Sequence, residues 1–316
     1  MTEYYERPQP KPSKELFYLI FYWILSFAVA TFASILVWWG MTGKSIMTIQ
    51  EDLLKPENLN AFKMIQVVST VISFFLPAYI TARSVSAQPF KRLGFVRSLK
   101  FDRLFLSIAI MLCVLPLVGF LADMNEAIPI SAKLRKIFES MESDYNEQIK
   151  KIAIFKSPLD YFTALIVIAF FPALVEEVFF RGAMQQIFMR WFVHPWLVIF
   201  ITSFIFSAIH FSWYGFIPRI ALGMMLGSIF YYTGNLWYSI AAHFFNNALM
   251  VTILYGQHLQ KKPIDMEVGD SAPWWAGLIS LVLVVLLLIK LHKTSVTKVL
   301  PDSITLNDSS DNHLSA

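Results

Sequence analysis

The sequence predicts an all-α integral membrane protein, a bundle of about eight transmembrane helices. Of its 316 residues, 56% are hydrophobic and only 15% are charged, whereas soluble domains carry about 25% charged residues. The apolar residues also gather in runs long enough to cross a bilayer, because a transmembrane helix needs about 20 consecutive, mostly apolar residues. Composition and run length together argue against a soluble protein.

Eight apolar runs are candidates for these helices. They cover residues 16–40, 64–82, 104–122, 161–189, 196–213, 216–233, 236–256 and 274–289. We expect them to form one membrane domain over residues 16–292. A short cytoplasmic segment, 1–15, precedes it, and a Ser-, Asp- and Asn-rich tail, 293–316, follows it. Such a polar composition predicts that the tail is disordered.

The charges in the loops predict how the helices are oriented. The 83–103 loop holds six basic residues against one acidic residue, whereas the 41–62 loop holds two basic and three acidic residues. Loops rich in Lys and Arg stay in the cytoplasm. With eight spans, this predicts a multi-pass cell-membrane protein with both termini and the 190–195 turn in the cytoplasm. The basic residues are therefore topology signals, and we expect no nucleic-acid partner.

The 123–160 connection is the one sizeable polar insertion between the runs. Apolar residues recur in it at helical spacing, with Lys, Arg and Glu between them. This pattern predicts an amphipathic helix that lies on the membrane or caps the bundle. In the sixth run, Gly223 and Gly227 form a small-xxx-small pair, which predicts a close contact between two helices.

Two adjacent carboxylates, Glu176 and Glu177, interrupt the fourth run. A charged residue such as Asp or Arg at the centre of a membrane helix costs about 2.5–3.5 kcal/mol, and adjacent like charges also repel. Arg181 follows Glu177 by four residues, so the two share a helical face and can form an ion pair. Glu176 is rotated by about 100° from Glu177. It is therefore free to point towards another partner.

The possible partners of Glu176 lie in two later runs. His210 follows Phe206 by four residues, and His243 precedes Asn247 by four. If the fourth and fifth runs form an antiparallel hairpin, Glu176 and His210 are symmetric about residue 193 and lie at matching depth, about 20 Å from the helix ends. His243 lies only about 10 Å from the start of its run. Either the turn before that run is submerged or the helices are staggered.

These groups suit hydrolysis of an acyl compound. A carboxylate and an imidazole at one depth can activate a water molecule. A second imidazole and an amide on one helix face can donate hydrogen bonds to an oxyanion. The pattern therefore indicates a hydrolase whose active site lies inside the membrane.

The three motifs together resemble the CPBP family, the CAAX proteases and bacteriocin-processing (Abi) enzymes. They are Glu176-Glu177-x-x-x-Arg181, Phe206-x-x-x-His210 and His243-x-x-x-Asn247, within a motif-bearing core of residues 160–256. The resemblance implies an eight-helix intramembrane protease of the type II CAAX endopeptidase kind. It further implies that Glu176 and His210 activate the water, that His243 and Asn247 stabilise the oxyanion, and that Glu177, Arg181 and Phe206 support them.

The resemblance implies a peptide or lipidated protein as substrate and the lipid bilayer as surroundings. The catalytic type is either a glutamate peptidase or a metallopeptidase. We expect no cofactor, because the chain lacks a His-Glu-x-x-His helix; if zinc is bound, Glu176, His210 and His243 are the ligands to expect. Two other functions remain open: a non-catalytic immunity or scaffolding protein of the same fold, and a proton-coupled transporter, because buried Glu and His also relay protons.

Overall fold

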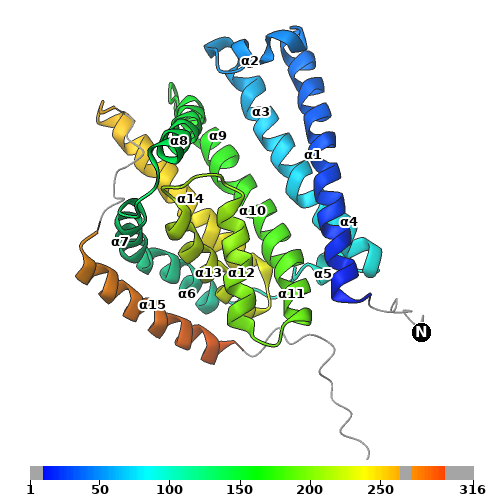
Figure 1. Cartoon of the computed structure of the whole chain (residues 1–316), viewed down its shortest axis with the longest axis vertical. Helices are drawn as coiled ribbons and strands as arrows, with labels where there is room; N and C mark the ends of the chain where they lie inside the picture. Colours follow the sequence, from blue (N-terminus) through cyan, green and yellow to red (C-terminus); the bar gives the residue numbers. More distant parts are fainter. Residues whose placement is uncertain (1–9, 264–271, 296–316) are drawn as a thin grey trace, which may run out of the picture.

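The computed structural model describes residues 10–263 and 272–295, and in this part every regular element is helical. Figure 1 shows the helices packed side by side, with α8, α14 and α15 on one flank of the bundle and α1, α3 and α4 on the other. The prediction of an all-α membrane protein is confirmed. The tail that was predicted to be disordered covers residues 293–316. From residue 296 on, it lies outside the described residues.

Helices occupy the positions of all eight predicted spans. The first four segments are α1 (Pro12–Thr42), α3-η3-α4 (Leu59–Thr70, Val71–Phe75, Leu76–Val85), α6-α7 (Phe101–Cys113, Leu115–Glu126) and α9-η4-α10-η5-α11 (Pro158–Ala164, Leu165–Phe170, Phe171–Glu177, Val178–Gln185, Gln186–Trp191). The last four are α12 (Pro195–Ala208), α13 (Phe216–Thr233), α14 (Leu236–Leu259) and α15 (Trp274–Thr294). Shorter helices in the connections are η1 (Ile46–Thr48), α2 (Ile49–Asp52), η2 (Pro56–Asn58) and α5 (Pro89–Arg92).

Five helices of the described chain are long and apolar enough to cross a membrane, and α12 is a shorter apolar helix. The protein is therefore a multi-pass membrane protein, and the number of eight transmembrane helices stays a prediction. The first helix, α1, begins at Pro12, before the apolar run that starts at residue 16. Proline suits the first turn of a helix, where its missing N–H has no partner to lose. At the other end α15 continues to Thr294, just past the predicted residue 292.

The second and fourth segments each contain a π-helical turn that ends two residues before a proline. Pro77 follows η3 and Pro172 follows η4. A proline inside a helix removes one backbone hydrogen bond and its ring crowds the preceding turn, and a wider π turn accommodates both effects. A further π-helical stretch, η5, begins directly after Glu177. The helix that carries the two carboxylates is thus irregular on both sides of them.

The fifth helix corrects the predicted span of residues 196–213, because α12 ends at Ala208. His210 and Phe211 donate backbone hydrogen bonds to the third residue before them, which tightens the last turn. Phe211 then takes a left-handed conformation, with φ of 51°, which no helix can continue. The 14 residues of α12 rise only about 21 Å, whereas the hydrocarbon core is about 30 Å thick. By itself, α12 is therefore too short to cross the hydrocarbon core.

The backbone of the 209–215 turn is anchored by side chains of neighbouring helices. Asn125 of α7, which is fully buried, donates to the carbonyl of Trp213 at 2.7 Å and accepts from the amide of Ile217 at 3.2 Å. Ser207 donates to the carbonyl of Phe216 at 2.7 Å. Irregular backbone at membrane depth is tolerated only where protein satisfies its polar groups. These bonds explain how α12 can end inside the bundle.

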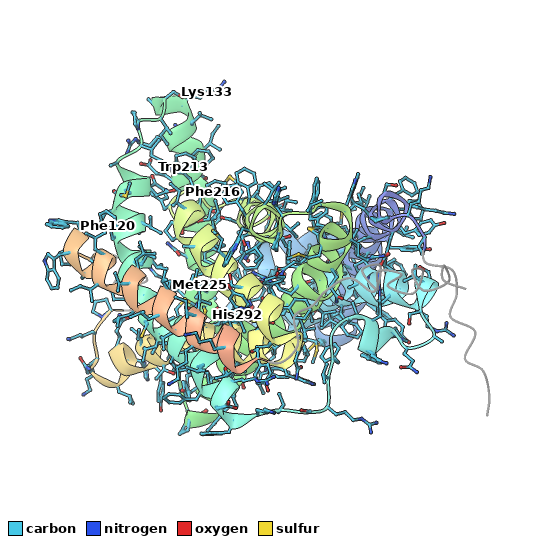
Figure 2. The ribbon with its side chains drawn as sticks, turned by 90° about the horizontal axis from the view of Figure 1, so that it is seen from below. Phe120, Lys133, Trp213, Phe216, Met225 and His292 are labelled. Atoms are coloured by element: carbon cyan, nitrogen blue, oxygen red, sulfur yellow. The ribbon has the colours of Figure 1, made fainter. Side chains whose placement is uncertain are left out.

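The predicted amphipathic helix is present as α8 (Ala132–Ile152), with Ser131 as its N-cap. It covers the 209–215 turn: the ring of Phe138 stacks on that of Trp213 with centroids 5.2 Å apart, and Ser212 donates to the Glu142 carboxylate at 2.7 Å. Its last turn buries Ile149 and Ile152. Figure 2 shows Trp213 directly beneath the end of the helix that carries Lys133. Of the two predicted roles, α8 takes that of a cap on the bundle.

The ends of the bundle that carry the predicted cytoplasmic charges meet at one face. Glu15, at the start of α1, forms ion pairs with Arg92 of the 83–103 loop and with Arg190 of α11. Arg103, at the start of α6, donates to the carbonyl of Thr294 at the end of α15, at 2.9 Å. The loop, the 190–195 turn and both described chain ends thus lie on the same side of the molecule.

The predicted close contact at Gly223 and Gly227 joins α13 to α12. A Cβ added at Gly223 would stand 2.9 Å from Cβ and 3.2 Å from Cα of Ser203, and one at Gly227 would stand 3.1 Å from Cγ2 of Ile199. Side chains larger than hydrogen would push the two helices apart. The two glycines let α12 and α13 approach closely, as the sequence predicts.

We expect Gly223→Ala to lower the free energy of unfolding by about 1–3 kcal/mol, the usual cost of overpacking a close contact. The measurement is thermal unfolding in detergent. Gly256→Ala is the matched control, because no atom lies within 4 Å of a Cβ placed there. Equal melting temperatures for the two variants would contradict the packing argument.

Candidate active site

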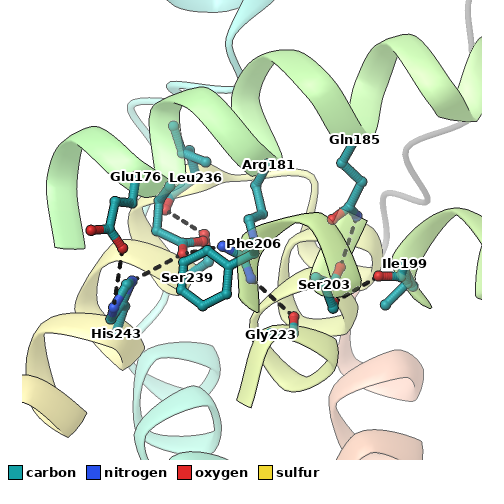
Figure 3. A network of polar contacts seen from close by, with 12 residues as sticks. Glu176, Arg181, Gln185, Ile199, Ser203, Phe206, Gly223, Leu236, Ser239 and His243 are labelled. Carbon is teal, nitrogen blue, oxygen red and sulfur yellow. Dashed lines mark hydrogen bonds and ion pairs between the residues drawn. The ribbon is translucent and has the colours of Figure 1, made fainter. Parts of the chain in front are cut away.

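The predicted ion pair between Glu177 and Arg181 is the centre of the polar network in the bundle (Figure 3). Arg181 Nη1 donates to Glu177 Oε1 at 2.8 Å, and both side chains are fully buried. Each lies in the fourth helical segment, four residues apart, across the boundary between α10 and η5. Their mutual neutralisation makes two charges tolerable in an apolar interior.

Arg181 also holds the neighbouring helices together. Its Nη2 donates to the carbonyl of Gly223 in α13 at 3.0 Å. Its guanidinium lies over the ring of Phe206 in α12, with 4.8 Å between Cζ and the ring centroid. A planar guanidinium can make these contacts at once, whereas a lysine cannot. Phe206 thus packs against the ion pair, and its supporting role in the site stays a prediction.

His243 of α14 lies between the two carboxylates. Its Nδ1 is 3.1 Å from Glu177 Oε1, and its Nε2 is 3.9 Å from Glu176 Oε2. Because Glu177 can only accept when it is ionised, Nδ1 carries the proton and donates it to Glu177. In neutral His243, Nε2 then faces Glu176 as an acceptor. The gap of 3.9 Å is too long for a direct hydrogen bond and suits a bridging water molecule.

Glu176 points away from Arg181, as its rotation on the helix predicts (Figure 3). It is nearly buried, with 12% of its side chain exposed, against none for Glu177. Neighbouring carboxylates thus differ in surroundings: Glu177 is bound by Arg181 and His243, and Glu176 keeps oxygen atoms available to other molecules. This difference separates a structural carboxylate from one that can react.

Glu176 and His210, which were predicted to lie at matching depth and to activate a water molecule together, share no direct contact among the described residues. His210 Nδ1 lies 2.7 Å from the carbonyl of Phe206, and its ring packs edge-on against the Phe206 ring at 4.9 Å. His243 takes the place beside Glu176 instead. The hairpin argument gave a depth for His210, but α12 ends before this residue, so its direction is set by the 209–215 turn and not by a helix face.

Asn247 stands one helical turn after His243 on α14. Its Oδ1 accepts from Nδ2 of the adjacent Asn246 at 3.4 Å. It is half-buried, as is Asn246. In the structure, Asn247 makes no hydrogen bond to the carboxylates, and its role in an oxyanion site stays a prediction.

The turn before α14 determines how deep His243 lies. Gly234 takes a left-handed conformation, with φ of 62°, and ends α13. The Asn235 side chain caps α14 and donates to the carbonyls of Val96 and Ser98, while Leu236 N–H donates to the carbonyl of Gly94. The 94–98 segment thus packs directly on this turn, and the two alternatives for the depth of His243, a submerged turn or staggered helices, stay predictions.

Arg219, in the first turns of α13, is a charged residue that the sequence analysis did not single out. Its charge interacts with those of Glu176 and of Glu142 in α8. The signal was present, since Arg219 is the lone charged residue between positions 216 and 233. The cost of a charge in an apolar run, applied to the Glu pair, also applies here.

The residues present do not fit a catalytic zinc ion. Such a site needs three protein ligands around the metal. Within the described ranges, no group of three or more His, Cys, Asp and Glu side chains could hold a metal ion. The contacts of His210 with a backbone carbonyl and of His243 with Glu177 both use Nδ1, and the remaining donors of Glu176, His210 and His243 do not gather around one point.

Comparison with known protein families gives one match. Residues 158–249 match the model of a family described as type II CAAX prenyl endopeptidase Rce1-like. The matched region begins with α9 and ends within α14, so it contains both carboxylates and both histidines of the site. Comparisons with curated proteins and with solved structures found no match.

We expect Arg181→Ala to destabilise the fold severely, because Glu177 would remain buried with its main partner gone. Removing one side of a buried pair costs about 3–5 kcal/mol. The measurement is the melting temperature in detergent, together with the yield of folded protein.

Arg83→Ala is the matched control, since Arg83 is exposed in the last turn of α4. Adding Glu177→Gln to Arg181→Ala should recover part of the loss, because the unpaired charge is then removed. An Arg181→Ala variant as stable as the wild type would refute the structural role of the pair.

Proposed function

We propose that this chain, whose residues 158–249 belong to the Rce1-like family of type II CAAX prenyl endopeptidases, is an intramembrane endopeptidase. It hydrolyses a peptide bond of a membrane-associated or lipidated substrate of the CAAX kind. The observation that carries the proposal is Glu176, a carboxylate in an apolar helix with one oxygen 3.9 Å from His243. Its neighbour Glu177 is already neutralised by Arg181.

Glu176 is proposed as the general base. A water molecule between Glu176 Oε2 and His243 Nε2 would lose a proton to the carboxylate as its oxygen attacks the scissile carbonyl carbon. Low polarity around the site strengthens the interaction of each charge with the water. Glu177 holds the His243 tautomer by accepting from Nδ1, so Nε2 faces the water.

His210, His243 and Asn247 complete the proposed machinery. His210 is assigned to water activation with Glu176, and its half-buried position at the end of α12 leaves room for this. His243 and Asn247 are assigned to the oxyanion, as in the family that the motifs resemble: Nδ2 of Asn247 is available to donate, and His243 can donate from Nε2 once that nitrogen takes up a proton. The proposed catalytic type is that of a glutamate peptidase without a resident metal, since the donor set does not fit zinc.

Replacing Glu176 by Gln keeps the shape of the side chain and removes the base. We expect turnover of a prenylated CAAX peptide by the purified protein to fall at least ~10²-fold. The melting temperature should hold or rise, because a charge that lacks a full partner leaves the membrane interior. Peptide cleavage and thermal unfolding are measured on the same preparation.

Glu147→Gln is the matched control, as an equal change at an exposed position of α8. The wild type should also stay active after chelation and dialysis. Full activity in Glu176→Gln would contradict its role as base. Activity lost on metal removal and restored by zinc would contradict the metal-free mechanism, while a wild type without peptidase activity would favour the scaffolding or transporter alternatives.

We further propose that the protein lies in the cell membrane with both termini in the cytoplasm. The face that collects Glu15, Arg92, Arg103, Arg190 and Thr294 is the one with the basic loop, and basic loops stay inside. Reporter fusions at Gln88 and after the last helix should both give a cytoplasmic signal. An external signal from either fusion would reverse the orientation.

A further inference from the structure

Arg219 carries a buried charge that the proposed mechanism does not use. Its Nη1 is buried and has no hydrogen-bond partner, and within the described ranges no carboxylate oxygen lies within 4.0 Å of its guanidinium. It is also the fourth residue of α13, close to the helix N-terminus, where the helix dipole disfavours a cation. A cation so placed is costly unless an anion forms beside it.

The backbone next to Arg219 makes room for its guanidinium. Arg219 N–H donates to the carbonyl of Gly215 at 2.9 Å. A Cβ at Gly215 would stand 2.6 Å from Nη2 and 3.2 Å from Nη1 of Arg219. The guanidinium therefore lies directly against the glycine backbone of the 209–215 turn, whose position is fixed by Asn125 and Ser207.

The guanidinium lies against the same turn that carries His210, which places its charge near the candidate active site. Arg219 interacts electrostatically with Glu176 and His210, which are the proposed water-activating pair. It also interacts with Glu142 and Tyr145 of the capping helix α8. His210 and Arg219 flank the same anchored turn, so one local structure positions both.

We propose that Arg219 is a further catalytic residue, which donates Nη1–H to the oxyanion formed at the scissile carbonyl. The inference rests on the proposed peptidase function. Water oxygen bonds to the carbonyl carbon, Glu176 takes the water proton, and the carbonyl π electrons move onto the oxygen beside Arg219. When the intermediate collapses, the C–N bond breaks and the proton on Glu176 passes to the leaving amine nitrogen.

Two features favour this role for Arg219. Of the two side chains otherwise assigned to the oxyanion, His243 has its Nδ1–H on Glu177, and Asn247 accepts from Asn246 through Oδ1, which leaves only the Nδ2 of Asn247 to donate. Moreover, general-base catalysis moves a negative charge from Glu176 to the substrate oxygen. A fixed cation that interacts with both Glu176 and the substrate oxygen compensates the negative charge before and after this transfer. Such compensation has its largest effect in a site that contains little water.

The test uses the full-length protein and an internally quenched, farnesylated CAAX peptide, made once with a free C-terminal carboxylate and once with an amide. For Arg219→Gln we expect kcat to fall about 10²–10³-fold, the usual effect of removing an oxyanion donor. KM should change little, and the loss should be equal for both peptides. Arg219→Lys should retain more activity, because a charge remains.

Arg135→Gln is the matched control, an exposed arginine of α8. A rise in KM confined to the free-acid peptide would overturn the oxyanion role and make Arg219 an anchor for the substrate carboxylate. An unchanged kcat of Arg219→Gln would also overturn the oxyanion role. So would a loss of activity that only parallels a fall in the melting temperature.

Gly215→Ala keeps the test valid if Arg219→Gln does not fold. It displaces the guanidinium but keeps its charge, so kcat should again fall with little change in KM, and wild-type kcat would contradict the proposal. Wild-type cleavage and its loss in Glu176→Gln are measured first. If the wild type cleaves neither peptide, the peptidase function itself fails; if only the Arg219 prediction fails, the function stands.

Discussion

The buried ion pair of Glu177 and Arg181 is the interaction on which the rest of the site depends. Both side chains are fully buried, so neither charge has water to solvate it. In place of water, Arg181 binds Glu177, the carbonyl of Gly223 and the ring of Phe206. These three partners belong to three different helical segments. The pair thereby fixes α12 and α13 against the helix that carries Glu176.

The same pair also sets the orientation of His243. Oε1 of Glu177 accepts hydrogen bonds from both Arg181 and Nδ1 of His243. As a result, Nε2 of the imidazole faces Glu176. Glu177, which looks redundant in the sequence, therefore acts through His243. It orients the imidazole that faces Glu176, the proposed reactive carboxylate. The two adjacent glutamates have separate tasks because one helical residue turns them about 100° apart.

A second constraint is the early end of α12. The helix stops inside the bundle, and the turn that follows brings His210 and Arg219 to the same region as Glu176. Polar backbone at this depth requires partners, which Asn125, Ser207 and Ser212 provide. The cap formed by α8 excludes lipid from the turn. The early end of α12, the hydrogen bonds to the turn after it and the cap formed by α8 thus depend on one another.

The sequence by itself determined the fold class, the approximate place of a helix in each apolar run, the Glu177–Arg181 pair and the close contact at Gly223. All of these depend on local spacing or on the length of apolar runs, which the order of residues specifies. It also singled out His210, His243 and Asn247 as candidates, because polar groups are costly in apolar helices.

Only the tertiary structure decided which of them meet. Whether His210 or His243 stands beside Glu176 depends on where α12 ends and how the 94–98 segment covers the Asn235 turn, and both follow from contacts between distant residues. The proposed role of Arg219 depends on the same packing, because it follows from the groups that the folded chain places near the guanidinium. Spacing along the chain specifies the face and depth of a side chain, but three-dimensional packing specifies its partner.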